Sequence, residues 1–493
     1  MTKSNKYIPW LLILLLSMRA KAEISLSALF SDNMILQQKS IVKIWGYGNV
    51  SEKVGINASW NNETYFSTTD TDGVWEYNLA TPLYGGPYTI KLTGDSTLTL
   101  KNILIGDVWL CSGQSNMEMP IGGWGKVLNY EMEIANANYD QIRYFNVNHY
   151  TSNQPLQDVK YFKQWQVCSP KTAEEFSAVA YFFAREVYNK TKIPIGIINA
   201  SYQGTAIQAW MGRDAFIANA KMKRITDSIF TDYKTWEQMK NAYDSAKTSN
   251  SPPFRPQDTP TVLYNAMIYP LKKCSIKGFL WYQGENNVGG ARLYEEYFKA
   301  MINNWRQTFN HQNLPFYFVQ LANYKQKTTD IDRSYWAELR EAQAKALSLP
   351  FTGMAIAIDI GEADNVHPKN KQEVGRRLAL VALSKSYKRN ISYSGPIFKK
   401  VKRKNGSVIL FFKHAKRLRT NDGASPKGFI IAGNDKKFVH ASARISGNRV
   451  VISSRKISKP VSVRYGWGDN PDCNLYNKYD LPAAPFKTDS WDY

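Results

Sequence analysis

Residues 107–120 read DVWLCSGQSNMEMP, an apolar run that ends abruptly in small and amide side chains. The run Val108-Trp109-Leu110 predicts a buried strand, and Ser115 follows just beyond it, between a glutamine and an asparagine. In open α/β sheets, ligands bind at the carboxyl ends of the strands. We therefore interpret Ser115 as a nucleophile, for which the rest of the chain must supply partners.

The chain around this stretch alternates between short apolar runs and stretches with apolar residues at helical spacing. This alternation predicts an α/β domain with a parallel sheet covered by helices on both faces. The expected strands are 103–110, 142–147, 194–200, 276–283, 315–322 and 352–359, and the expected helices are 174–189, 293–309, 335–349 and 371–387.

Both flanks of this domain have the pattern of β structure. Residues 23–102 contain short β-branched and aromatic runs separated by turn residues, which predicts a β-sandwich-like domain. Alternating strands return in residues 390–493, which predicts a C-terminal β-rich region. The catalytic domain then spans 103–389, with a polar helical insertion at about 211–260.

The first 22 residues have the features of a secretory signal peptide. A positive start precedes the apolar run Ile8–Met18, and Ala20-Lys21-Ala22 offers small residues for cleavage before Glu23. The run is short for a membrane span, although an uncleaved anchor is the alternative. We expect an exported protein, periplasmic or extracellular, with no integral membrane span after cleavage.

The positive charge is concentrated in one region. The formal net charge is +22, and residues 391–460 hold 17 Lys and Arg against 2 Asp. We interpret this region as a solvated basic face, with attraction of an anionic glycan or acidic lipid as the alternative. No nucleic-acid-binding motif is present, so no nucleic-acid partner is expected. The sequence does not indicate the oligomeric state.

The four cysteines are widely spaced, at Cys111, Cys168, Cys274 and Cys473. No CxxC pair is present, which argues against a zinc cluster. Export would permit disulfides, and buried free thiols remain the alternative.

A serine hydroxyl needs a positioned base, and that base is usually a histidine oriented by a carboxylate. Only His367 among the five histidines lies between an apolar strand and an amphipathic helix. Asp364 stands three residues earlier, and Pro368 favours an extended conformation at His367. A polar loop with a helix cap is the alternative reading of these residues.

Two further segments could stabilise an oxyanion or contact substrate. Gly204 follows the strand at 194–200, and a glycine allows close approach of the backbone to substrate. The segment after the strand at 276–283 supplies polar side chains at the same edge of the sheet, Gln283, Glu285, Asn286 and Asn287. A plain turn and a polar loop are the respective alternatives.

These motifs together resemble the SGNH (GDSL-like) hydrolase superfamily, and most closely the sialate O-acetylesterase family. The resemblance rests on motifs in the expected order and extends to both ends of the mature chain, through CSGQSNM, GTAIQAW, WYQGENN and DNVHP, with LFSDNMILQQ near the start and LPAAPFKT near the end.

The resemblance implies a flavodoxin-like catalytic domain in which Ser115 is the nucleophile, His367 the base and Asp364 its orienting carboxylate. It also implies oxyanion donors at Gly204 and in the third motif, where Glu285 is a rival for the carboxylate role. No metal or cofactor is implied. The implied substrate is an O-acetylated glycan, with sialic acid as the expected sugar.

Several other functions remain as alternatives or are disfavoured. The same chemistry could act on acetylated xylan or pectin, and a non-catalytic glycan-binding protein is a further alternative. Scattered histidines argue against a metal-dependent deacetylase. The absence of a GxSxG motif around Ser115 argues against an α/β-hydrolase lipase.

Overall fold

A computed structural model describes residues 24–220, 222, 233–245, 255–328 and 333–491. The predicted signal peptide and parts of the predicted insertion, at 221, 223–232 and 246–254, lie outside the described residues. Within the described part of the chain, no helix combines the length and apolar character needed to cross a membrane.

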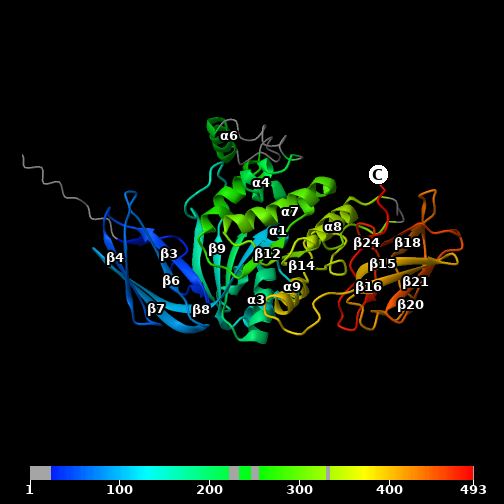
Figure 1. Cartoon of the computed structure of the whole chain (residues 1–493), viewed down its shortest axis with the longest axis horizontal. Coiled ribbons are helices and arrows are strands. Elements are labelled where there is room, and N and C mark those ends of the chain that lie inside the picture. The colour runs from blue at the N-terminus through cyan, green and yellow to red at the C-terminus, as the bar shows by residue number, and fades with distance from the viewer. Residues whose placement is uncertain (1–23, 221, 223–232, 246–254, 329–332, 492–493) are drawn as a thin grey trace, which may run out of the picture.

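The N-terminal region is built from short strands, as its sequence predicts (Figure 1). One sheet has three antiparallel strands, β1 (Ser25–Leu26), β3 (Ile41–Tyr47) and β6 (Val74–Ala80). In a second set, β2 (Ile35–Gln37) and β7 (Gly85–Thr93) pair with the first half of β8, β4 (Lys53–Ala58) pairs with β7, and β5 (Thr64–Thr68) pairs with β4. The side chains of Trp45, Ile56 and Trp75 are buried in this region.

Strand β8 (Thr97–Gly113) connects the N-terminal strands directly to the central sheet. Its first half pairs antiparallel with β7, and its second half pairs parallel with strands of the α/β region. The predicted domain boundary at residue 102 therefore falls inside a continuous strand. The resulting sheet is mixed, because N-terminal antiparallel pairs and parallel pairs share one strand.

The central sheet has the strand order β10-β9-β11-β8-β12-β13-β14. Its members besides β8 are β9 (Tyr139–Val147), β10 (Phe162–Cys168), β11 (Ile195–Ser201), β12 (Gly278–Tyr282), β13 (Phe316–Val319) and β14 (Thr352–Ala355). All neighbours on this path pair in parallel except β9 and β10. The six strands predicted for this region are confirmed, whereas β10 was not predicted.

Numbered along the chain, the six parallel strands have the order 2-3-1-4-5-6, and without β9 the other five follow the flavodoxin-like order 2-1-3-4-5. The third parallel strand, β11, lies between the first, β8, and the second, β9. It pairs with β8 along its whole length, so Ser201 lies opposite Gly113. This pairing brings the loop after β11 next to the segment that carries Ser115.

Helices cover both faces of the central sheet (Figure 1). Helices α3 (Ala178–Thr191) and α9 (Lys371–Lys385) pack against each other on one face, and α7 (Ala291–Thr308) and α8 (Tyr335–Lys345) pack together on the other. These are the four predicted helices, with ends that differ by a few residues.

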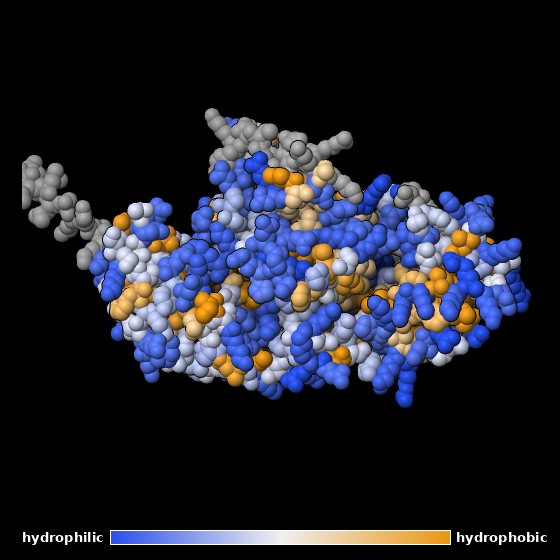
Figure 2. Space-filling view, in the orientation of Figure 1, coloured by the Kyte–Doolittle hydropathy of each residue, from blue (hydrophilic) through white to orange (hydrophobic). Residues whose placement is uncertain are grey.

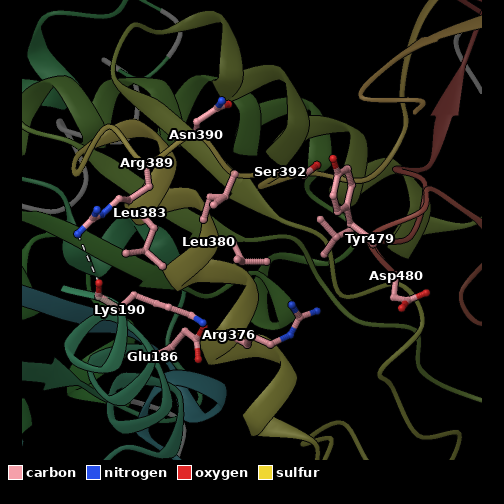
Figure 3. A pocket seen from close by; sticks show the side chains of 12 residues that line it. Glu186, Lys190, Arg376, Leu380, Leu383, Arg389, Asn390, Ser392, Tyr479 and Asp480 are labelled. Carbon is pink, nitrogen blue, oxygen red and sulfur yellow. Dashed lines mark hydrogen bonds between the residues drawn. The ribbon is translucent and has the colours of Figure 1, made fainter. Parts of the chain in front are cut away.

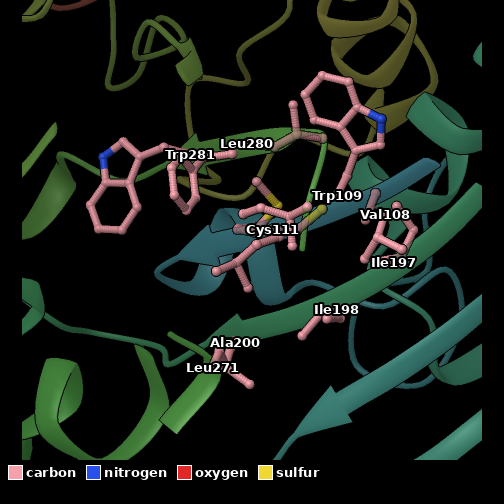
Figure 4. Packing of buried hydrophobic residues seen from close by; sticks show 14 of the residues in the cluster. Val108, Trp109, Cys111, Ile197, Ile198, Ala200, Leu271, Leu280 and Trp281 are labelled. Atoms are coloured by element: carbon pink, nitrogen blue, oxygen red, sulfur yellow. The ribbon is translucent and has the colours of Figure 1, made fainter. Parts of the chain in front are cut away.

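Tryptophans of neighbouring strands fill the two interfaces between sheet and helices. The Trp109 ring on β8 packs edge-on against Phe183 of α3. The Trp281 ring on β12 packs edge-on against Trp305 of α7. Figure 4 shows the side chains of the three central strands in close packing around Trp109, Cys111, Ile197, Ile198 and Leu280.

Four further helices are present in the described part of the chain. They are α1 (Ser115–Glu118), α2 (Tyr130–Ala135), α4 (Arg213–Ile217) and α6 (Tyr233–Ser245). The last two lie within residues 211–260, the range of the predicted insertion.

The C-terminal region is β-rich, as predicted, and has a hydrophobic cluster of its own. One four-stranded sheet contains β15 (Ile397–Lys404), β16 (Ser407–Lys413), β21 (Arg449–Ser453) and β20 (Ser442–Ser446). A second contains β19 (Phe438–His440), β18 (Phe429–Ala432), β22 (Ser462–Tyr465) and β24 (Phe486–Lys487), and β17 (Arg419–Thr420) pairs with β23 (Leu475–Tyr476). All basic residues of β15 are exposed, and Figure 2 shows hydrophilic surface over much of this region.

A cavity of about 630 Å³ lies between the C-terminal region and the face formed by α3 and α9. Figure 3 shows apolar and charged side chains from both sides lining it, among them Glu186, Lys190, Leu380, Leu383, Tyr479 and Asp480. All four cysteines in the structure are free, at Cys111, Cys168, Cys274 and Cys473.

Candidate active site

Ser115 is the first residue of α1, at the carboxyl end of β8. Gly113 has φ +145°, and a Cβ atom there would lie 2.1 Å from the carbonyl oxygen of Tyr282, so only glycine allows β8 and β12 to approach so closely. The N–H groups in the first turn of a helix have no partner within the helix. The backbone N–H of Ser115 therefore points out of α1 beside a side chain that is only 6% exposed.

The structure brings Ser115 and His367 together. His367 lies in the loop between β14 and α9, and its Nε2 atom is 2.7 Å from Oγ of Ser115. This is hydrogen-bonding distance, and it is the contact required for an imidazole to remove a serine proton.

The environment of His367 favours the neutral imidazole. Its pKa is lowered from 6.5, first by burial and then by the positive charge of Lys371, while Glu118 acts in the opposite direction. A neutral ring can accept a proton near neutral pH, so this shift suits a general base.

Asp364 is not brought to the imidazole. Its carboxylate is exposed and accepts a hydrogen bond of 2.5 Å from Nε2 of Gln326. In the same loop, the His367 backbone N–H donates to Oδ1 of Asn365 at 2.9 Å. Among the described residues, no hydrogen bond joins Asp364 to His367.

Glu285 is also held away from the imidazole. It begins a short helical turn after β12, and its Oε1 atom accepts a hydrogen bond from Nδ2 of Asn116. Its Oε2 atom is buried without a hydrogen-bond partner. Burial raises the pKa of this carboxyl group. In the described structure, neither of the two predicted carboxylates therefore contacts His367.

Gly204 lies in the loop after β11 with φ +65°, a conformation that favours glycine. Its carbonyl oxygen accepts a hydrogen bond of 2.9 Å from the Arg255 guanidinium. The neighbouring Tyr202 backbone N–H donates to the carbonyl oxygen of Gly113 at 3.0 Å. These bonds fix the Gly204 loop beside the start of α1.

Most of the predicted amide side chains of the third segment bind other loops. Nε2 of Gln283 donates to the carbonyl oxygen of Thr205 at 3.1 Å, and Oδ1 of Asn287 accepts from the Ile207 backbone N–H at 2.9 Å. The Asn286 backbone N–H donates to Oε1 of Gln114 at 3.3 Å, and its side chain is exposed. These residues tie the loops after β8, β11 and β12 together.

Aromatic rings form the rim of the site. The Trp124 ring packs edge-on against the His367 ring with 5.5 Å between centroids, and 52% of the residue is exposed. The His149 ring stacks on Tyr202 at 3.8 Å, and its Nε2 atom lies 2.9 Å from a carboxylate oxygen of Glu118. In the described ranges, no group of three or more His, Cys, Asp or Glu residues is placed to hold a metal ion.

The model of the family described as "Carbohydrate esterase, sialic acid-specific acetylesterase" matches residues 105–241 and 245–384. The chain belongs to this family. It is 30% identical to the sialate O-acetylesterase of Mus musculus over 93% of each chain. It is 29% identical to the human protein of the same name, over 92% of this chain and 91% of that one.

The similarity to a solved structure extends beyond the residues that the family model matches. A carbohydrate acetylesterase from Xanthomonas citri has a TM-score of 0.84 and 37% identity with this chain, covering 95% of this chain and all of that one. The family match, the sialate O-acetylesterase relatives and this neighbour together identify the protein as a carboxylic ester hydrolase.

The structure adds residues to the site of this carbohydrate esterase that the sequence did not single out. Trp124 carried no signal, because an isolated tryptophan is usually part of a core. Lys371 did carry a signal in the sequence. It is the first residue of α9, and a cation at a helix N-terminus is electrostatically unfavourable. Asn116 directly follows Ser115, and only the structure shows what its amide binds.

Proposed function

We propose that this carbohydrate esterase is a serine esterase of the SGNH type that removes O-acetyl groups from sugars through an acetyl-enzyme. The observation that carries the proposal is the distance of 2.7 Å between Oγ of Ser115 and Nε2 of His367. The names of the relatives and of the solved neighbour support acetylated carbohydrate as the substrate.

In the proposed first half-reaction, His367 accepts the Ser115 proton while Oγ attacks the acetyl carbonyl carbon. The negative charge on the carbonyl oxygen is stabilised by the backbone N–H groups of Ser115 and Gly204, as in other acyl-transfer sites. The bond to the sugar oxygen then breaks, and His367 donates its proton to that oxygen. Free sugar and acetyl-Ser115 remain.

In the second half-reaction, water replaces the sugar. His367 accepts a proton from water, whose oxygen attacks the acetyl-Ser115 carbonyl. Collapse of this intermediate breaks the bond to Oγ, and the proton returns to Ser115. Acetate leaves, and no metal or cofactor takes part in any of these steps.

Asp364 is the proposed orienting carboxylate. It lies in the same loop as His367 and is exposed, so rotation of its side chain could exchange Gln326 for the imidazole. Glu285 has a fixed partner in Asn116, which supports a structural role for it. The third-segment amides are proposed to support the oxyanion loop through Thr205 and Ile207.

Sialic acid is the proposed sugar, since the curated relatives carry the name sialate O-acetylesterase. The exposed Trp124 ring beside His367 offers an apolar surface on which a sugar ring can stack. We also propose that the chain is exported, on the basis of its N-terminal sequence.

The proposal is tested by acetate release from O-acetylated sialosides, acetylated xylan and acetylated pectin. Wild-type protein should release acetate fastest from the sialosides, and Ser115→Ala should release none above background. Faster release from xylan or pectin would reassign the sugar and leave the mechanism intact. No release from any substrate would favour a glycan-binding protein.

A further inference from the structure

A fully buried lysine lies directly behind the proposed catalytic pair. Lys371 is 0% exposed, and its Nζ atom donates to Oδ1 of Asn116 at 2.6 Å and to the carbonyl oxygen of Pro368 at 2.7 Å. Lysine is rarely buried without a paired charge, because removing an ammonium from water is unfavourable. The interactions of Lys371 must therefore offset the free-energy cost of removing its amino group from water.

Asn116 connects this lysine to the nucleophile and the base. It directly follows Ser115, and its Nδ2 atom donates to the carbonyl oxygen of Val366 at 2.9 Å. Val366 and Pro368 flank His367 in the chain. Asn116 thus holds the residue before His367 directly, and it holds the residue after His367 through Lys371.

We propose that Lys371 and Asn116 are positioning residues, which together bind both sides of His367 and so fix its imidazole against Ser115. This inference rests on the proposed function, since it assigns a role within the same site. Neither residue takes part in bond making. Their contribution is to hold two chain segments, 252 residues apart, at the distance that proton transfer requires.

An ion pair does not account for the buried lysine. The charge of Glu285 acts on Lys371, but the described residues contain no ion pair between the two, and Oε1 of Glu285 binds Asn116 instead. The Tyr282 ring lies 5.7 Å from Nζ on the side of β12. The two hydrogen bonds to the Ser115 and His367 segments are therefore the main polar contacts of the ammonium.

The charge of Lys371 has a second consequence for the same pair. A cation close to the imidazole disfavours imidazolium, so Lys371 lowers the pKa of His367 in addition to the effect of burial. Glu118 faces His367 with the opposite effect, and Glu285 and Glu362 face Lys371. Loss of the Lys371 charge should therefore raise the pKa of His367.

The test compares wild-type protein with Lys371→Met, which keeps an unbranched side chain, one atom shorter, and removes the amino group. Lys385→Met is the matched control, because Lys385 lies at the other end of α9 and contacts the Tyr393 ring rather than the site. Turnover of 4-nitrophenyl acetate should fall about 10²-fold in Lys371→Met, as expected for a misplaced catalytic pair. It should stay within twofold of wild type in Lys385→Met.

A second readout does not depend on turnover. Histidine labelled with ¹³C gives five side-chain signals, and the His367 signal is identified by its loss in His367→Gln. The titration midpoint of His367 should move to higher pH in Lys371→Met and stay unchanged in Lys385→Met. A purely structural role for Lys371 would lower the unfolding temperature without moving this midpoint.

Asn116→Ala provides a second variant in case Lys371→Met does not fold. It should also lose about 10²-fold in turnover, with a normal amount of folded protein. The inference is overturned if a folded Lys371→Met or Asn116→Ala protein keeps wild-type turnover, or if the His367 midpoint does not move in folded Lys371→Met. If wild-type protein is inactive, or Ser115→Ala is active, the proposed function itself fails.

Discussion

The imidazole of His367 reaches Ser115 across 252 residues of sequence, with 2.7 Å between Nε2 and Oγ. Two features of the fold produce this contact. Ser115 follows β8 in the middle of the sheet, and His367 follows β14 at its edge, so both lie beyond the carboxyl ends of parallel strands. The bonds of Asn116 then join the two loops directly.

The pH dependence of catalysis should report the lowered pKa of His367. In the proposed mechanism only the neutral imidazole accepts the Ser115 proton, so kcat/KM should rise with pH as His367 loses its proton. Because burial and Lys371 lower this pKa, the midpoint should lie below 6.5. The measurement is a pH profile of kcat/KM with a substrate that does not ionise, and a midpoint above 6.5 would contradict the account.

The orienting carboxylate is identified by comparing Asp364→Asn with Glu285→Gln. Asp364→Asn should lower kcat by several orders of magnitude, on the order of the 10⁴-fold measured for the same exchange in a serine protease. Glu285→Gln keeps an oxygen to accept from Asn116, so it should lower kcat far less. A larger loss in Glu285→Gln would transfer the role to Glu285, and equal activity in both variants would exclude both assignments.

Trp124 should contribute to sugar binding rather than to bond cleavage. Trp124→Ala removes an exposed ring beside His367, and loss of one stacked contact should raise KM for an O-acetylated sugar by about tenfold, or 1.4 kcal/mol. Turnover of 4-nitrophenyl acetate, which has no sugar, should change little.

Phe66→Ala is the control for Trp124→Ala, because Phe66 is 56% exposed and lies on β5, in the N-terminal region. It should leave both substrates unaffected. An equal loss on both substrates in Trp124→Ala would show that the ring supports His367 instead of the sugar.

Lys371 should also make the stability of the protein depend on pH. Burial lowers its pKa from 10.5 to about 7 in the folded protein. Between these values the unfolded chain binds more protons, so this group makes the free energy of unfolding increase with pH from about 7 to 10.5. The stability difference, wild type minus Lys371→Met, should therefore be larger at pH 9 than at pH 7 in denaturant titrations. A constant or falling difference would contradict the lowered pKa of Lys371 in the folded protein.

The strands and helices of the α/β region could be predicted because their apolar periodicity is strong and local. The segments around Gly113, Gly204 and His367 were likewise marked by loops that follow buried strands. The placement of β9 and β10 beyond β11 could not be predicted, since it is a choice among long-range pairings. The continuity of β8 could not be predicted either, because a long strand shared by two regions has the same sequence pattern as two adjacent short strands.

The detailed geometry of the site could not be predicted from the sequence, for a different reason. Gln283 and Asn287 are amides of the type that can stabilise an oxyanion, but an amide serves equally well to bind a neighbouring backbone, which is what both do here. Asp364 stands at the expected spacing from His367, yet spacing does not determine where a side chain points. Lys371 is a cation at the start of a helix, which is a weak signal in the sequence. Its role could not be inferred, because it depends on a hydrogen bond to Asn116, which is distant in the chain.

The central claim, that Ser115 is a nucleophile activated by His367, is tested most directly by covalent labelling with a fluorophosphonate followed by peptide mapping. The label should appear on Ser115 and be absent from Ser115→Ala. It should persist in the control Ser112→Ala, which removes a nearby buried hydroxyl group that makes no hydrogen bond to the described residues. Labelling of a different residue, or undiminished labelling of Ser115→Ala, would contradict the account.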